Sequence, residues 1–303
     1  MEYISYDKFC VDIQKALQER CGQEVQVKLH KVLKINGVML RGISIIGKEN
    51  AAIMPTLYLD KFYMEYKQGR KWEEIISAFL EEYDKAGVEN EFNIQFFEEY
   101  EELKTHLAYK LIHYEMNMEL LTEVPYRKYL DLAIVCYCDI KDKRIGHGSI
   151  LIRREHLKMW KITEDRLFTD AMQNMPKLYE ADFMNMAVML KKLYDDPADL
   201  LSRPLALFVL TNKARINGAA SMLYDGQLEK IASFLGQDFY ILPSSIHEVI
   251  ILPKSEGTDE IYLSQMVDEI NREQLAREEI LSNHAYLYHK DTKELVALPL
   301  IPY

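Results

Sequence analysis

The stretch that decides the fold is residues 238–252, Asp-Phe-Tyr-Ile-Leu-Pro-Ser-Ser-Ile-His-Glu-Val-Ile-Ile-Leu. Two short apolar runs, residues 238–243 and 247–252, flank a polar turn, and such runs are typical of buried β-strands. A connection this short joins antiparallel neighbours, because parallel strands need a long crossover. The segment therefore predicts a hairpin inside an antiparallel sheet.

Further strands and helices are predicted around this hairpin. The predicted strands are residues 130–139, 148–153, 205–211, 218–224, 284–289 and 294–298, and the predicted helices are residues 164–174, 183–194, 226–235 and 259–281. Because the strands are joined mostly by short turns, the chain is expected to be α+β, with antiparallel sheets and packed helices.

The N-terminal third predicts a separate lobe. It comprises a helix at residues 4–20, strands at 24–35, 38–46 and 53–59, and a helix at 72–86. Asn36-Gly37 is the favoured dipeptide of a two-residue type I′ turn, which would pair Ile35 with Val38 and Leu33 with Leu40. We therefore expect two lobes, an α-β-β-β-α lobe over residues 1–90 and a larger α+β lobe over residues 91–303.

A long amphipathic helix is predicted over about residues 95–122. Its apolar seam recurs at intervals of three and four residues and consists of Phe96, Tyr100, Leu103, Leu107, Leu111, Tyr114, Met118 and Leu121. Pro125 would end the helix. We expect a core or inter-lobe helix, with a homodimer through the 96–121 seam as the alternative.

Composition and charge limit the classes of partner and compartment. The 303 residues carry 37 basic and 48 acidic side chains, a net charge of −11, so a nucleic-acid partner is not expected. The chain shows no secretory signal and no charge-free apolar stretch of membrane-spanning length, so no membrane partner is expected either. Four cysteines in this length indicate a reducing cytoplasm, and Cys136 and Cys138 are expected to be core side chains on one strand.

Charge is nevertheless spread unevenly along the chain. Residues 23–48 sum to +4, whereas residues 73–102 sum to −10. We expect solvated faces to carry these charges, with a charged partner as the sharper alternative.

Motifs of common catalytic families are absent from the sequence. Gly146-His147-Gly148 is the only GxG and lacks a third glycine, and no phosphate loop, HExxH, CxxC or GxSxG occurs. We therefore predict no cofactor. Glu102, His106 and His113 would share a stripe of the long helix, but no second ligand set matches them, so no metal site is predicted.

The turn of the opening hairpin carries the candidate catalytic residues, Ser245, His247 and Glu248. If strand geometry begins by Ser245, its side chain and that of His247 share one face while Glu248 points to the other. A hydrolase would then need a third group from elsewhere to orient His247. Three interpretations stay open here: a structural turn, a ligand or partner site, and a catalytic site.

Several segments resemble an uncharacterised bacterial family, domain of unknown function 5688, over about residues 5–298. They are residues 54–59, 131–135, 171–176, 210–212 with 217–219, and 242–248. A fainter similarity to the uncharacterised family 1444 covers the Pro-containing turn. The resemblance implies a cytoplasmic bacterial protein and supplies no catalytic residues. Candidate binding residues lie in its segments and are Asn174, Asn212, Ser244, Ser245 and His247.

Taken together, these observations favour a non-enzymatic interaction or adaptor protein. It would hold a protein or peptide through its charged faces, its 20 tyrosines and the turn at residues 243–248. The alternative is an enzyme, a hydrolase or nucleotide-modifying activity, with its site at Ser244–Glu248.

Overall fold

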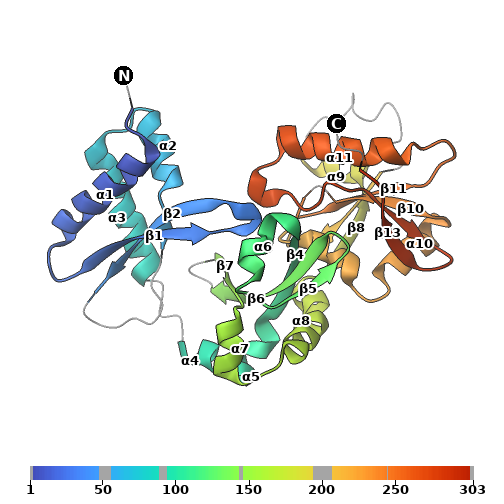
Figure 1. The fold of residues 1–303 in the computed structure, drawn as a ribbon, viewed down its shortest axis with the longest axis horizontal. Helices are drawn as coiled ribbons and strands as arrows, with labels where there is room; N and C mark the ends of the chain where they lie inside the picture. The colour runs from blue at the N-terminus through green and yellow to red at the C-terminus, as the bar shows by residue number, and fades with distance from the viewer. Residues whose placement is uncertain are drawn as a thin grey trace. The chain divides into compact units, whose positions relative to one another are not determined.

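The structure is a computed structural model that describes residues 3–47, 56–88, 94–142, 146–193, 207–243 and 245–300 (Figure 1). The chain forms two compact units, residues 1–102 with 140–148, and residues 103–139 with 149–303. Helices alternate with sheets built from antiparallel strand pairs, which confirms the predicted α+β class.

The first unit places helices on one face of a three-stranded sheet with the order β1-β2-β3. Its elements are α1 (Tyr6–Cys21), β1 (Gln26–Leu33), η1 (Ile35–Gly37), β2 (Met39–Ile46), β3 (Leu57–Tyr58), α2 (Asp60–Lys67), α3 (Trp72–Val88) and α4 (Ile94–Glu98). Ser5 caps α1 by accepting a hydrogen bond from the backbone of Lys8. Phe9, Ile43 and Phe79 are fully buried in the core between helices and sheet.

The β1–β2 hairpin forms as predicted, but its predicted turn and register are wrong. Leu33 lies opposite Met39, and the turn spans residues 34–38, closed by a 2.8 Å bond from the backbone N–H of Lys34 to the Val38 carbonyl. Asn36 is left-handed, with φ of 58°. The Asn-Gly pair thus closes a longer loop than the two-residue turn it favours, which shifts the pairing by one residue.

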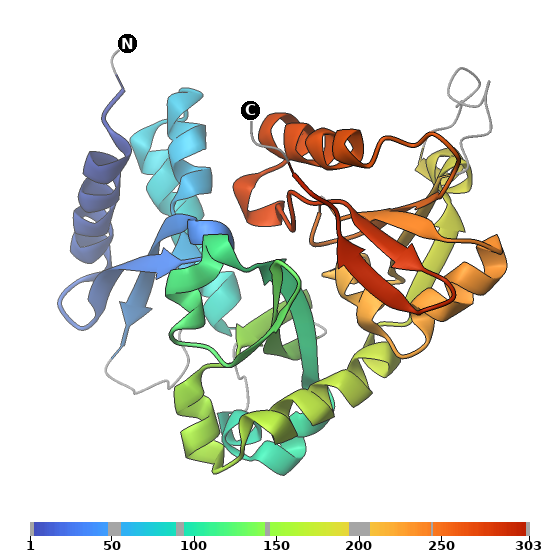
Figure 2. The ribbon, with the colours of Figure 1, turned by 45° about the vertical axis from the view of Figure 1, so that its right-hand side comes forward.

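The second unit is built around a six-stranded sheet with the order β13-β12-β10-β11-β9-β8. Its strands are β8 (Ala181–Asn185), β9 (Phe208–Asn212), β10 (Phe239–Leu242), β11 (Val249–Pro253), β12 (Tyr286–His289) and β13 (Glu294–Ala297). The predicted hairpin at residues 238–252 is confirmed at the centre, where Ile241 pairs with Ile251. Helix α11 (Glu260–Gln274) lies along one face and α10 (Gln227–Leu235) on the other (Figure 2).

One predicted helix of this unit is wrong at its start, and one predicted strand is wrong. The start of the predicted helix at 183–194 belongs to edge strand β8, and only α9 (Met186–Leu193) is helical. The predicted strand at 218–224 is a 3-10 helix, η4 (Gly218–Leu223), in which the Ser221 hydroxyl donates to the Gly218 carbonyl. The strand conformation of β8 depends on its pairing with β9, and the spacing of apolar residues within β8 does not indicate such a long-range contact.

The second unit also contains most of a smaller sheet, with the order β4-β6-β5 and β7 beside β6; the end of β6 from residue 140 and the start of β7 up to residue 148 are grouped with the first unit. The remaining elements are α5 (Tyr100–Leu103), η2 (Lys104–His106), β4 (Leu107–His113), η3 (Glu115–Asn117), α6 (Met118–Leu121), β5 (Tyr126–Tyr129), β6 (Leu132–Asp142), β7 (Gly146–Leu151), α7 (Arg154–Trp160), α8 (Glu164–Leu178) and η5 (Arg277–Glu279). Cys136 and Cys138 are fully buried on β6, as predicted. Burial raises the pKa of the Cys138 thiol to about 12, so the thiol stays neutral.

The predicted helix over residues 95–122 is wrong. Only short helices flank β4, and β4 is a strand buried on both faces. Ala108 and Ile112, which lie off the predicted seam, are fully buried, whereas Met118 on the seam is 51% exposed. A strand covered on both faces is apolar throughout, so its residues matched a helical spacing by coincidence. The homodimer through the 96–121 helix therefore loses its basis.

Asp131 connects the two sheets of the second unit. It lies in the turn between β5 and β6 and accepts hydrogen bonds from Ser282 at 2.7 Å and from the Tyr286 hydroxyl at 2.6 Å. Both donors are fully buried. A carboxylate needs such donors when it leaves water, so this contact fixes where the small sheet lies against β12.

The described residues hold no helix long and apolar enough to cross a membrane. Within the same ranges, no three His, Cys, Asp or Glu side chains are grouped so that they could hold a metal ion. Glu102, His106 and His113 lie on α5, η2 and β4 and do not form the predicted helical stripe.

A pair of truncations tests β4 against the predicted helix. Ile112→Ala should lower the free energy of unfolding by about 2–5 kcal/mol, because it leaves a cavity in a buried strand. Met118→Ala should change it by about 0.5 kcal/mol or less, because Met118 is exposed. Urea unfolding followed by circular dichroism measures both free energies. A larger loss for Met118→Ala than for Ile112→Ala would contradict β4 and support the predicted helix.

His113 should make the protein less stable in acid. Burial lowers the pKa of His113, and its Nδ1 accepts the backbone N–H of Met116 at 3.3 Å, as a neutral ring does. The unfolded chain, with a histidine pKa of about 6.5, then binds a proton that the folded chain does not. Stability is present above that pH and falls as the pH drops below it.

His113→Asn keeps a hydrogen-bond acceptor near the position of Nδ1 but removes the imidazole that binds the proton. We expect the variant to lose less unfolding free energy between neutral pH and pH ~5 than the wild type, whatever its stability at pH 7. Burial lowers the pKa of His156 as well, so adding His156→Gln should flatten the profile further. Denaturant titrations at several pH values give the slopes, and an unchanged slope in both variants would contradict the assignment.

Candidate functional site

The turn after β10 uses its polar groups to hold the chain together. The Ser245 hydroxyl accepts the backbone N–H of His247 at 3.0 Å, and Ser245 is 6% exposed. Ser245 also bridges to Ile280, and the backbone of Ile246 donates to Glu279 at 3.0 Å. Ser244 lies outside the described residues. Ser245 thus closes a turn through its side chain, a common role for serine.

His247 is bound through its backbone rather than its ring. Its carbonyl accepts a 2.7 Å bond from the Thr211 hydroxyl, while the imidazole Nδ1 is buried without a partner in the part of the chain that the structure describes. The ring makes no hydrogen bond to Ser245 or to the half-buried Glu248 there. The serine–histidine hydrogen bond that activates a nucleophile is therefore not formed in this arrangement.

Gly218 brings a second candidate, Asn212, beside His247. A Cβ on Gly218 would lie 2.9 Å from the backbone nitrogen of Asn212 and would overlap the His247 carbonyl oxygen. Asn212 is fully buried, and its side chain donates to the Ile216 carbonyl at 2.8 Å and accepts the Ile216 N–H. The structure thus joins Asn212 and His247 around a close backbone approach that only glycine permits.

Asn174 lies elsewhere, on α8, where its amide donates to the Lys104 carbonyl.

A buried network that the sequence did not reveal lies closer to η4. The Tyr179 hydroxyl donates to Asp139 at 2.6 Å, and the Tyr224 hydroxyl donates to the Tyr179 carbonyl at 2.7 Å. Burial raises the pKa of Tyr179 and of Tyr224, so both stay protonated. The hydroxyls of these two tyrosines therefore form hydrogen bonds in the interior and do not contribute to a binding surface.

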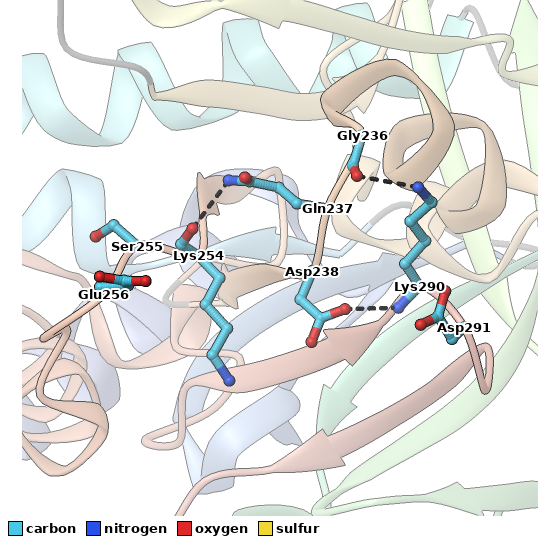
Figure 3. A pocket seen from close by; sticks show the side chains of 8 residues that line it. All are labelled: Gly236, Gln237, Asp238, Lys254, Ser255, Glu256, Lys290 and Asp291. Atoms are coloured by element: carbon cyan, nitrogen blue, oxygen red, sulfur yellow. Dashed lines mark hydrogen bonds between the residues drawn. The ribbon is translucent and has the colours of Figure 1, made fainter.

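A cavity of about 460 Å³ opens at the other end of β10 and β11 (Figure 3). It is lined by Gly236, Gln237, Asp238, Lys254, Ser255, Glu256, Lys290 and Asp291. These residues follow α10, follow β11 and lie in the β12–β13 turn, so antiparallel pairing brings them together at one end of the strands. None of the residues predicted for the site lines this cavity.

Three charged residues of the cavity, Asp238, Lys254 and Lys290, have partners in backbone groups or neighbouring side chains. Lys290 donates from Nζ to the Gly236 carbonyl and from its backbone to Asp238, both at 3.0 Å (Figure 3). That backbone bond, more than the nearby His289, holds the pKa of Asp238 below its usual value. Lys254 lies 3.4 Å from Glu260. A cavity with two lysines and three acids suits a partner that carries both signs of charge.

Three phenylalanines form a surface cluster, the aromatic patch, on the α10 face of the same sheet. Phe183 on β8 and Phe208 on β9 stack with centroids 5.1 Å apart, and Phe234 meets each edge-on at 5.8 Å. Phe234 is 68% exposed although it belongs to this cluster. The three residues are distant in sequence, so no motif could have identified the patch.

Gly218→Ala should destabilise the fold by about 1–3 kcal/mol, because its Cβ overlaps backbone atoms that cannot move away cheaply. Gly47→Ala is the matched control, since a Cβ there meets nothing within 4 Å among the residues that the structure describes. Thermal unfolding by circular dichroism compares the two. Equal melting temperatures would show that β9, η4 and the turn do not approach as closely as described.

No curated protein and no solved structure matches the chain. The sequence pattern of a family of unknown function, DUF5688, matches residues 6–290, which include the turn, the aromatic patch and every residue that lines the cavity except Asp291. The chain therefore belongs to the DUF5688 family.

Proposed function

We propose that the protein is a non-enzymatic interaction protein that binds a protein or peptide partner at the aromatic patch. The observation that carries this proposal is the exposure of Phe234, which is 68% accessible while its ring is held by Phe183 and Phe208. Exposed aromatic side chains with restricted motion are typical of interface hot spots.

The surroundings of the patch support a binding surface. Gly236, which lines the charged cavity, follows Phe234 by two residues, and Phe208 pairs with Ile251 near the cavity end of β11. An apolar centre beside a charged rim is the usual composition of a protein interface. The partner segment should therefore offer apolar side chains to the patch and charged groups to Lys254, Asp238 and Glu256.

A hydrolase or nucleotide-modifying site at Ser244–Glu248 receives less support. The Ser245 hydroxyl accepts the backbone N–H of His247, and the Asn212 amide donates to the Ile216 carbonyl, so both side chains serve the structure of the protein.

The chain is proposed to act in the cytoplasm. Its four cysteines, three of them buried, are free thiols, as is usual in a reducing compartment.

A displayed library of random peptides, selected on the intact protein, tests the proposal. We expect enriched peptides whose binding to Phe234→Ser is at least tenfold weaker, because a hot-spot aromatic contributes about 1.4 kcal/mol or more. Phe234 is exposed, so the substitution should leave the fold intact, as circular dichroism would verify.

Tyr262→Ser is the matched control, since Tyr262 is 57% exposed on α11, on the opposite face of the sheet. Its variant should bind the selected peptides like the wild type. Selected peptides that bind Phe234→Ser as tightly as the wild type, or a selection that enriches none, would count against the patch.

A further inference from the structure

We infer that β8 is a pairing edge for a second copy of this chain, joined antiparallel about a two-fold axis at Phe183. This inference goes beyond the proposed function and does not require it, although the pairing would unite the aromatic patches of two copies. It arises from the position of β8 at the end of the six-stranded sheet, with β9 on its inner side.

The backbone of β8 presents hydrogen-bonding groups outward. Flanking bonds from Lys213 to Glu180 and from Met186 to Leu207 fix which residues bond to β9. By the antiparallel alternation, Asp182 and Met184 bond inward. Ala181, Phe183 and Asn185 therefore direct their N–H and C=O groups away from the sheet, and no strand pairs with them in the described part of the chain.

The sequence of β8 does little to protect this edge. Ala-Asp-Phe-Met-Asn contains no proline and no lysine, and Asp182 is its only charge. Natural edge strands are usually blunted by such residues or by bulges, because an open edge templates pairing with another chain. An edge that no described strand covers, beside an exposed aromatic cluster, is therefore our candidate for pairing with a second copy.

Self-pairing of β8 gives a register without conflict. With Phe183 opposite its symmetry mate, Ala181 lies opposite Asn185 of the second copy, so the outward groups of both strands meet. Phe183 faces Phe183, a favourable aromatic pair across strands. Asp182 faces Met184 rather than another Asp182, so no like charges meet.

The two-fold axis would stand perpendicular to the sheet, so Phe183 rings from both copies lie on one face. The patches would then merge into a single aromatic surface of six phenylalanines. Such a dimer offers two adjacent binding positions, which raises avidity for a partner that carries two copies of the recognised segment.

Opposite charges at Met184 test this register. Met184 lies on the other face from Phe183, so its substitution leaves the aromatic patch untouched. Met184→Lys places lysine opposite Asp182 in two symmetric pairs and should tighten dimerisation about fivefold, whereas Met184→Glu should weaken it by a similar factor. Sedimentation velocity over a range of micromolar concentrations measures the dimer dissociation constant.

A backbone variant provides an independent measurement. Ala181→Pro removes an outward N–H that β9 does not use, so the monomer should fold while the dimer weakens at least tenfold. A monomeric wild type at all concentrations, or a shift in the same direction for Met184→Lys and Met184→Glu, would overturn the inference.

The inference and the proposed function can fail separately. Phe234→Ser lies off the edge and should retain the dimer while it loses the selected peptides. If the wild type is monomeric yet binds peptides through Phe234, the edge inference falls and the proposed function stands. If the dimer forms but no peptide depends on Phe234, the proposed function falls.

Discussion

The fold of the second unit depends on the hydrogen bonding of one turn, in which Pro243, Ser245 and Ile246 are buried. Buried backbone groups that cannot reach water need partners within the protein. The Pro243 carbonyl accepts from Ser282, the Ile246 carbonyl accepts from Ala219, and the Ile246 N–H donates to Glu279. The turn is thereby hydrogen-bonded to η4 on one side and to the segment before β12 on the other. The Ser245 hydroxyl, which could have served catalysis, holds the turn instead.

The sequence could predict the elements that depend on local residue patterns, and it could not predict those that depend on long-range contacts. The hairpin at residues 238–252 and helix α10 were predictable, because each carries its own periodicity and turn residues. Residues 107–113 were not, since a strand buried on both faces is apolar throughout and matches helical spacing as well. The position of β8 depends on pairing with β9 more than twenty residues later, which no short window contains.

The same distinction explains the candidate site. Ser245 and His247 stand out in sequence because reactive side chains are adjacent there, yet adjacency does not set the geometry that catalysis needs. The aromatic patch is the reverse case: Phe183, Phe208 and Phe234 are unremarkable individually and meet only because two strands and a helix pack together. An interaction surface assembled from distant residues leaves no motif, so the fold is needed to find it.

The acidic charge of the chain sets a condition on association. A net charge of −11 repels a second copy, but at physiological ionic strength salt largely screens the repulsion between exposed charges more than about 8 Å apart. Beside β8, Glu180 is paired with Lys213 at 2.6 Å, and within β8 itself Asp182 is the one charged residue. Backbone hydrogen bonds and aromatic contacts act at short range, so pairing at this edge depends on local contacts more than on the net charge of the two copies.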